Sequence, residues 1–207
     1  MYKRQGYQGE DIKDLAKEYA DLNGDSLVNV SAKERKKALV DYALPKNIKK
    51  MQADMEKYKI FYDKWFFESE LHKSGAVKAV VDLLTKKGLT YEKEGAVWYK
   101  NKEVLTQKLL KEGKSQKYID NLELKDDVLI RQNGNPTYFT ADIAYHKNKF
   151  DRGFTTLIDV WGADHHGHVM RMKGAMDAIG YDGDKLNVVL MQLVKLVKDG
   201  ELSLIHI

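Results

Sequence analysis

The sequence predicts an α/β protein in which a mainly helical region of about 125 residues precedes a parallel sheet with crossover helices. Two observations predict this fold. Apolar residues recur at helical spacing through much of the first part, and after Asp127 apolar runs alternate with amphipathic stretches in the order strand, helix, strand, helix, strand. A chain of 207 residues is also long enough to bury a core.

The elements of the first part follow from their apolar spacing and their end signals. Residues 10–22 place apolar side chains one helical turn apart, and the turn "NGD" ends this helix. Ser31 precedes a long basic helix, which we expect Pro45 to break or kink because proline lacks the backbone N–H. "HKSGAVKAVVDLLTKKG" predicts another helix that stops at Gly88, and "YEKEGAVWYK" alternates like a short strand or hairpin.

The second part alternates strands and helices within about 75 residues. "DVLIR" predicts a strand, "QNGNP" a turn, and "TYFTADIAYHKNKF" a helix capped by Thr137 or Thr140. "TTLIDVWG" predicts a buried strand, "HHGHVMRMKGAMDAIG" a helix that Gly180 stops, and "LNVVLMQLV" a last strand. This rhythm is typical of a parallel sheet with right-handed crossovers.

Composition narrows the class of protein. Charged residues make up 32% and hydrophobic residues 43%, a globular balance, and no apolar run approaches the roughly 20 residues that cross a bilayer. No apolar segment follows the basic residues near the N-terminus, so we expect no secretory signal and no membrane partner. The absence of cysteine excludes disulfides and thiolate metal sites and fits a reducing cytoplasm.

Charge is distributed unevenly along the chain. Residues 31–60 hold nine Lys and Arg against four Asp and Glu, whereas residues 151–184 hold three Lys and Arg against six Asp. A basic region and an acidic one suit a polyanion such as RNA and a cationic small molecule, respectively. The alternative is that Lys-rich helices simply keep a solvated face.

The stretch "DVWGADHHGHVMR", residues 159–171, predicts a ligand pocket. A hydrophobic strand runs into Gly162 and Ala163, and open α/β sheets bind ligands beyond the carboxyl ends of their strands. The two small residues leave room for a base or ribose at the backbone. Asp164 and the histidines at 165, 166 and 168 can donate or accept hydrogen bonds there.

Three alternatives compete with a nucleotide and substrate pocket in this stretch. A metal site would need the adjacent His165 and His166 to face one ion, which a regular helix does not favour. A histidine general base is possible, although no Ser or Cys nucleophile motif accompanies it. The third alternative is a capped helix whose histidines bind nothing.

The stretch "NGNPTYFTADIAYH", residues 133–146, predicts a receptor for a cation. Tyr138, Asp142 and His146 lie four residues apart and so share one face of a helix. A carboxylate beside a phenol suits a guanidinium, whose donors match Asp and whose plane can stack on Tyr. The alternative is that Tyr138 packs and Asp142 only faces the positive end of the helix dipole.

Together the motifs "PTYFTADIAYH" and "WGADHHGH", in this order, resemble the bacterial-type arginyl-tRNA synthetases, a family of class I aminoacyl-tRNA synthetases. The resemblance extends to "GYQGEDIKDLAKEY" and to "YDKWFFESELHKSGAVKAVVDLLTKKGLTYEKEGAVWYK", and so spans residues 6–201. It implies a partial Rossmann-like parallel sheet. Residues 6–30 would end the first catalytic half, residues 31–125 would form a mainly helical insertion, and residues 126–201 would be the second half of the catalytic domain.

The same resemblance implies a reaction and its site residues. The parent enzyme activates arginine with ATP and Mg²⁺ to arginyl-adenylate, transfers the arginyl group to tRNA(Arg), uses no zinc and is expected to be a monomer. Tyr138 and Asp142 would bind the guanidinium of arginine, with His165 close to the same pocket. ATP would lie beside three residues that match the family pattern "GxDxxxH": Gly162, Asp164 and His168.

The sequence also departs from the family. The "HIGH" motif expected before residue 6, the "KMSKS"-like loop expected after residue 201 and the anticodon-binding domain are missing from it. The two motifs supply groups that stabilise charge on the transferring phosphates, so we expect the chain as given to show no aminoacylation activity. Another class I synthetase and a free-standing basic RNA-binding module remain as alternatives.

The two ends of the sequence are expected to be foreign to the gene. One codon choice for "LSLIHI", residues 202–207, has a reverse complement that encodes Met-Tyr-Lys-Arg-Gln when read from a GTG start, and these are residues 1–5. That nucleotide string resembles a transposon-end adapter. We therefore expect residues 1–5 and 202–207 to be translated adapter sequence.

Overall fold

The structure, a computed structural model, describes residues 9–192, 194, 197–198 and 201–202. The chain divides into two compact units, residues 1–65 and residues 66–207, and each is described by itself. The expected adapter residues 1–5 and 203–207 lie outside the described residues, and Leu202 ends the short strand β7.

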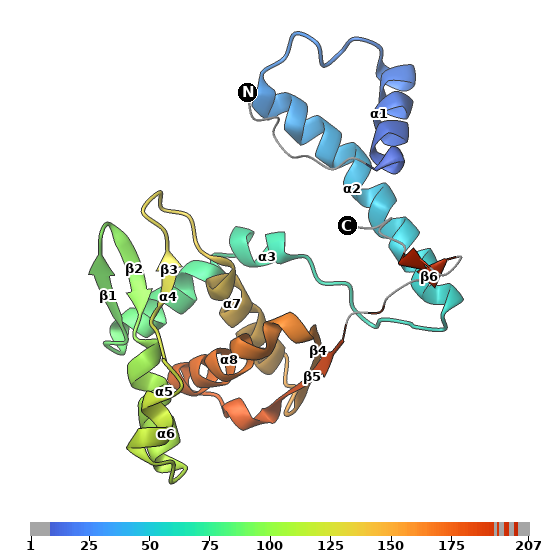
Figure 1. Cartoon of the computed structure of the whole chain (residues 1–207). Coiled ribbons are helices and arrows are strands. Elements are labelled where there is room, and N and C mark those ends of the chain that lie inside the picture. The colour runs from blue at the N-terminus through green and yellow to red at the C-terminus, as the bar shows by residue number, and fades with distance from the viewer. Residues whose placement is uncertain (1–8, 193, 195–196, 199–200, 203–207) are drawn as a thin grey trace. The chain divides into compact units, whose positions relative to one another are not determined.

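The first unit contains two helices, α1 (Glu10–Asn23) and α2 (Ala32–Lys57) (Figure 1). Ser31 begins α2 with a capping box, because its side chain accepts from the backbone N–H of Glu34 while the Glu34 carboxylate accepts from the backbone N–H of Ser31. The helices meet where the ring of Tyr19 packs edge-on against Tyr42, at 5.1 Å between ring centroids. Neither helix buries a side chain completely.

The predicted break at Pro45 is wrong, because α2 runs through this residue without interruption. Proline removes one backbone hydrogen bond from the helix, the one that residue 45 would donate to Asp41. The other bonds of a 26-residue helix and the capping box at Ser31 remain. The predicted helix at residues 10–22 is confirmed as α1.

The second unit begins with two helices where the sequence predicted one. They are α3 (Glu68–Lys73) and α4 (Ala76–Lys86). Gly75 separates them in the left-handed region with φ 76°, a conformation that glycine adopts without steric cost. Gly88, the predicted stop, follows α4 with φ 73°.

The predicted hairpin is confirmed and forms an antiparallel sheet with the next strand. The strands are β1 (Thr90–Lys93), β2 (Ala96–Tyr99) and β3 (Asp127–Ile130), in the order β1-β2-β3. Glu94 and Gly95 turn the hairpin with φ 54° and 72°, as a two-residue turn of positive φ requires. Helices α5 (Asn101–Lys111) and α6 (Gln116–Asp120) connect β2 to β3.

The predicted parallel sheet is smaller than the sequence indicated. Strands β4 (Leu157–Gly162) and β5 (Leu186–Met191) pair in parallel, and α8 (His166–Ile179) crosses between them. Strand β3 was expected in this sheet but pairs antiparallel with β2 instead. Short elements complete the unit: η1 (Ala163–His165), η2 (Gly183–Lys185), β6 (Val197–Lys198) and β7 (Glu201–Leu202).

The core of the second unit lies around helices α4, α7 (Tyr138–Asp151) and α8. Figure 1 shows α7 and α8 between the antiparallel sheet and the β4–β5 pair. Fully buried side chains of these helices and of strands β3 and β5 form this core, among them Leu84, Leu129, Ile143, Met172 and Leu186. Among the described residues, no helix has the length and apolarity needed to span a membrane.

Candidate functional site

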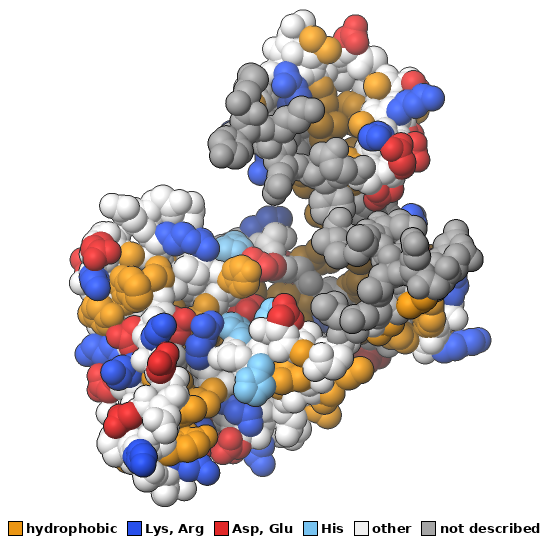
Figure 2. Space-filling view, in the orientation of Figure 1, with side chains coloured by type: hydrophobic (Ala, Val, Ile, Leu, Met, Phe, Trp, Pro, Cys, Tyr) orange, Lys and Arg blue, Asp and Glu red, His pale blue; other side chains and the backbone are white. Residues whose placement is uncertain are grey.

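A cavity of about 360 Å³ lies where β3, the start of α7 and the start of α8 meet. Figure 2 shows histidine side chains gathered on one face of this unit. The cavity brings together side chains from both motifs that the sequence singled out, and its lining residues are Asp127, Val128, Thr137, Tyr138, Phe139, Asp142, His165, His168 and Arg171.

Tyr138 and Asp142 lie one turn apart at the start of α7, as their spacing predicted. Tyr138 is 63% exposed, and the carboxylate of Asp142 is partly exposed. Thr137 is the N-cap residue, but its hydroxyl donates to the carbonyl of Val128 and so ties the start of α7 to β3. The phenol and the carboxylate are therefore both accessible at the cavity.

His146 does not share their environment. It is buried at 3% exposure, its Nδ1 donates to the backbone carbonyl of Asp142 at 2.7 Å, and its Nε2 contacts Asp159 on β4. Burial acts to raise the pKa of Asp159, but the hydrogen bonds from His146 and Lys149 outweigh it and hold this pKa below its ordinary value. His146 therefore joins α7 to β4 and does not face the cavity.

His168 lies at the centre of the cavity wall. Its Nε2 is 3.2 Å from Oδ2 of Asp142, and its Nδ1 is 2.9 Å from Nη2 of Arg171. The rings of Phe139 and Trp161 pack against it at 5.5 and 5.3 Å between centroids. Both ring nitrogens of His168 are therefore engaged by neighbouring side chains.

Asp127 and Arg171 form the back of the cavity. Nη1 of Arg171 is 3.3 Å from Oδ1 of Asp127, and its guanidinium lies 5.0 Å from the centroid of the Phe139 ring. Burial raises the pKa of Asp127, and the positive charge of Arg171 acts against that rise. Oδ2 of Asp127 and Nε of Arg171 are buried and have no hydrogen-bond partner among the described residues.

The turn after β4 carries the other predicted residues. Gly162 ends the strand, and Nδ1 of His165 lies 3.1 Å from Oδ1 of Asp164. The Asp164 side chain is 81% exposed. A Cβ on Gly162 would meet Oδ1 of Asp164 at 2.5 Å, so glycine lets this carboxylate fold back over the end of the strand. Gly162 and Asp164 do not line the cavity themselves. They lie next to it, because Asp164 contacts His165, which is one of the lining residues.

A second recess of about 360 Å³ lies on the other side of Tyr138 and Asp142 and contains Glu68 and His72 of α3. Nε2 of His72 is 3.3 Å from Oε1 of Glu68. Sequence reasoning missed Glu68 and also missed Asp127 and Arg171. The one available signal was the spacing of Arg171, three residues after His168 on the same helix face.

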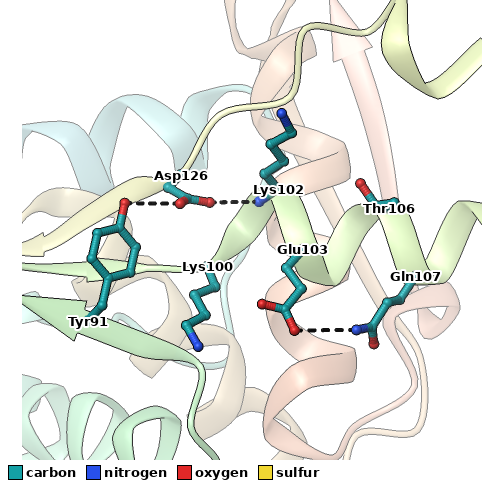
Figure 3. Close-up of a pocket in the computed structure, with 7 residues that line it drawn as sticks. All are labelled: Tyr91, Lys100, Lys102, Glu103, Thr106, Gln107 and Asp126. Atoms are coloured by element: carbon teal, nitrogen blue, oxygen red, sulfur yellow. Dashed lines mark hydrogen bonds between the residues drawn. The ribbon is translucent and has the colours of Figure 1, made fainter.

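A larger cavity, about 530 Å³, lies elsewhere, at the hairpin and α5 (Figure 3). The carboxylate of Asp126 accepts from the hydroxyl of Tyr91 and from the backbone N–H of Lys102, each at 3.0 Å. Gln107 likewise donates to Glu103 at 3.4 Å. Asp126 thus caps the start of α5 from a distant part of the chain, and this polar cluster has a structural explanation.

The metal alternative gains no support from the geometry. Within the described ranges, no group of three or more His, Cys, Asp or Glu is arranged to hold an ion. His165 contacts Asp164, whereas His168 contacts Asp142 and Arg171. His165 and His168 therefore have different hydrogen-bond partners.

Comparisons with known proteins show that the chain is similar to part of several arginine–tRNA ligases. Over 197 residues, or 95% of the chain, the sequence is 53% identical to the arginine–tRNA ligase of Caldanaerobacter subterraneus subsp. tengcongensis. The chain is homologous to part of an arginine–tRNA ligase. The arginine–tRNA ligase of Ruminiclostridium cellulolyticum is 48% identical over 203 residues, or 98% of the chain. The chain spans about a third of these relatives, 32% and 33% of their lengths.

Solved arginyl-tRNA synthetase structures resemble the chain as well. A Campylobacter jejuni protein described as an arginyl-tRNA synthetase matches with a TM-score of 0.76 and 36% identity, over 98% of this chain and 40% of its own. The arginyl-tRNA synthetase of Thermus thermophilus matches with a TM-score of 0.60 over 90% of this chain and 37% of its own. At 17% identity this second likeness is one of fold alone. No family model matches the sequence.

Proposed function

We propose that the chain supplies the arginine pocket and part of the ATP site of an arginine–tRNA ligase. In that reaction the carboxylate of arginine attacks the α-phosphate of ATP, pyrophosphate leaves, and the arginyl group of the adenylate then passes to tRNA(Arg). The observation that carries the proposal is the meeting of Tyr138, Asp142 and His168 at one cavity in a chain related to arginine–tRNA ligases.

The charges at the cavity support a cationic substrate. Asp127 is already paired with Arg171, whereas no Lys or Arg among the described residues forms an ion pair with Asp142. A guanidinium offers a planar fork of donors to a carboxylate, and its face stacks on a phenol such as that of Tyr138. His165 lines the same cavity and would lie beside the bound amino acid.

The ATP part of the proposal rests on the turn after β4. Gly162, Asp164 and His168 would border the nucleotide, at the carboxyl end of a parallel strand where α/β proteins bind ligands. Mg²⁺ would come with the ATP phosphates, since it commonly keeps several waters and takes only one or two protein carboxylates. The exposed carboxylate of Asp164 fits that limited part.

The proposal extends to the organisation of the longer protein. Residues 126–201 would be the second half of a Rossmann-like catalytic domain, and residues 31–125 an insertion within it. The basic residues 31–60 would face tRNA(Arg), because phosphates dominate the affinity of proteins for nucleic acids. The whole enzyme would act as a cytoplasmic monomer.

Binding of arginine to the purified chain tests the pocket. Titration calorimetry should detect arginine, and Asp142→Asn should weaken its binding about 10- to 100-fold, the usual cost of losing a hydrogen bond to a charged group. Asp151→Asn is the matched control, because Asp151 lies on the same helix but pairs with Lys147 away from the cavity. Equal losses in the two variants would contradict the assignment of Asp142.

A graft tests the activity. The 197 matched residues would replace the corresponding segment of the Caldanaerobacter relative. The grafted enzyme should catalyse arginine-dependent exchange of pyrophosphate into ATP in the presence of tRNA, and Asp142→Asn in the graft should abolish it. A folded graft that binds tRNA and catalyses no exchange would refute the proposed function.

A further inference from the structure

The contacts of His168 define where its proton lies. An arginine guanidinium donates hydrogen bonds and accepts none, so Nδ1 of His168 must accept from Nη2 of Arg171 at 2.9 Å. Nδ1 is therefore unprotonated in this arrangement, and the ring proton lies on Nε2. That proton points at Oδ2 of Asp142, 3.2 Å away.

We propose that Arg171, anchored by Asp127, is a positioning residue that keeps His168 neutral and so preserves the negative charge of Asp142 for a cationic substrate. The inference rests on the proposed function for the identity of that substrate, arginine. It gives Arg171 and Asp127 a role that neither sequence motif suggested.

The charge arithmetic of the site explains why neutrality matters. A protonated His168 would place a full positive charge beside Asp142, where it would compete with a guanidinium for the same carboxylate. With Arg171 in place, a second proton on His168 would have to sit on Nδ1, directly against a guanidinium that is always charged. The charge of Arg171 itself is offset by Asp127 at 3.3 Å.

Contacts with Phe139 and Asp127 fix the position of the Arg171 guanidinium. Its guanidinium packs on the ring of Phe139 at 5.0 Å, and the same ring packs edge-on against His168 at 5.5 Å. The Asp127 side chain is 15% exposed and comes from β3, a different element. The position of Arg171 is thus set by the sheet and by α7, and does not depend on α8 alone.

Other charged groups near α8 do not alter this arrangement. From η1, Asp164 and His165 contact each other. Lys87, which follows α4, donates to the carbonyl of Ala178 near the other end of the helix. Four charged groups from α5, α8 and η2 pair among themselves and do not line the cavity: Lys108, Lys173, Asp177 and Asp184.

Nitrogen NMR of the unliganded chain tests the tautomer directly. A long-range ¹H–¹⁵N spectrum separates bare from protonated ring nitrogens, and His168→Gln identifies the signals of His168. We expect Nδ1 to be unprotonated and Nε2 to be protonated at pH 7.5. A protonated Nδ1 at pH 7.5 would overturn the inference without any variant of Arg171.

Arginine binding by Arg171→Met tests the consequence. Methionine can still pack on Phe139 but donates no hydrogen bond, so Nδ1 of His168 would be free to take up a second proton as the pH falls. We expect arginine affinity in the variant to fall about tenfold between pH 7.5 and 5.5, beyond any change in the parent chain. An identical pH dependence in the two proteins would refute the role of Arg171.

Controls separate this role from charge loss and from unfolding. Lys173→Met removes the same charge from the same helix away from the cavity and should leave the pH dependence unchanged. Arg171→Lys restores a donor and should restore part of the affinity at pH 5.5. If Arg171→Met fails to fold, Asp127→Asn combined with Arg171→Met removes the unpaired buried carboxylate and takes its place.

Failure of the inference and failure of the proposed function give different results. If the parent chain binds no arginine but His168 has the expected tautomer, the substrate assignment is wrong and the tautomer stands. If the parent chain binds arginine but His168 is protonated on Nδ1, only the role of Arg171 is wrong.

Discussion

Three aspartates near the cavity have different environments and therefore different roles. Asp142 is partly exposed at the cavity and contacts Nε2 of His168. Asp127 is paired with Arg171. Asp159 is buried between His146 and Lys149 and serves the packing of α7 on β4. The chemical type is the same in each case, and the neighbours decide what it does.

Removing Asp159 should destabilise the second unit. Asp159→Asn leaves Lys149 without its counter-charge and His146 without its carboxylate partner in a buried place, which typically costs about 3 kcal/mol in the free energy of unfolding. Urea denaturation followed by far-ultraviolet circular dichroism measures this. Asp82→Asn is the control, since Asp82 forms an exposed pair with Lys78 and should cost less than about 1 kcal/mol.

The pH dependence of that difference has a definite sign. The folded pKa of Asp159 lies below its ordinary value, so its contribution is present above about pH 4 and is lost as the pH falls through the folded pKa. The parent chain and Asp159→Asn should therefore approach each other in stability below about pH 4. A difference that stays constant down to pH 2 would contradict the ion pairing.

At the scale of single residues, the sequence predicted correctly that two side chains lie close together where helical spacing alone decides it. Tyr138 and Asp142 are one helical turn apart, and the structure places both at the cavity. The same spacing argument failed for His146, because the inward face of α7 meets β4 and buries that residue. Asp127 and Arg171 are 44 residues apart in the sequence, and no local pattern predicts that they pair.

At the scale of elements, apolar patterning located strands without identifying their partners. The run at β3 was predicted as a strand and is one, but it pairs with the hairpin strand β2. A four-residue strand with three apolar residues fits an antiparallel edge as well as a parallel sheet, so its partner is decided by the connection through α5 and α6. The β4–α8–β5 unit was predicted correctly because its connection is a single crossover helix.

Gly183 allows the 3-10 helix η2 to pack closely against the backbone of α8. A Cβ at this position would lie 2.3 Å from the backbone carbonyl oxygen of Lys173, so backbone would have to move. Gly183→Ala should destabilise the chain by about 1–3 kcal/mol in urea denaturation.

The matched control for Gly183→Ala is Gly167→Ala on α8. A Cβ at Gly167 meets nothing within 4 Å, so alanine there should stabilise the helix by up to about 1 kcal/mol. Equal effects of the two substitutions would contradict the close contact at Gly183.

At the scale of the whole molecule, the relatives join the two units in one longer protein. The match to the Ruminiclostridium enzyme covers 98% of this chain and therefore includes the basic residues 31–60 as well as the cavity. A free-standing basic RNA-binding module is not favoured by that match. Charge composition alone could not decide this, because Lys-rich helices are common on solvated surfaces.

The central claim is that the cavity recognises the positive charge of a guanidinium. Citrulline has nearly the same shape as arginine but carries a neutral urea group. Titration calorimetry of the chain at pH 7.5 should show arginine binding and citrulline binding at least about tenfold more weakly, as the loss of a charge-assisted hydrogen bond requires. Equal affinity for the two ligands, or binding of neither, would contradict the account.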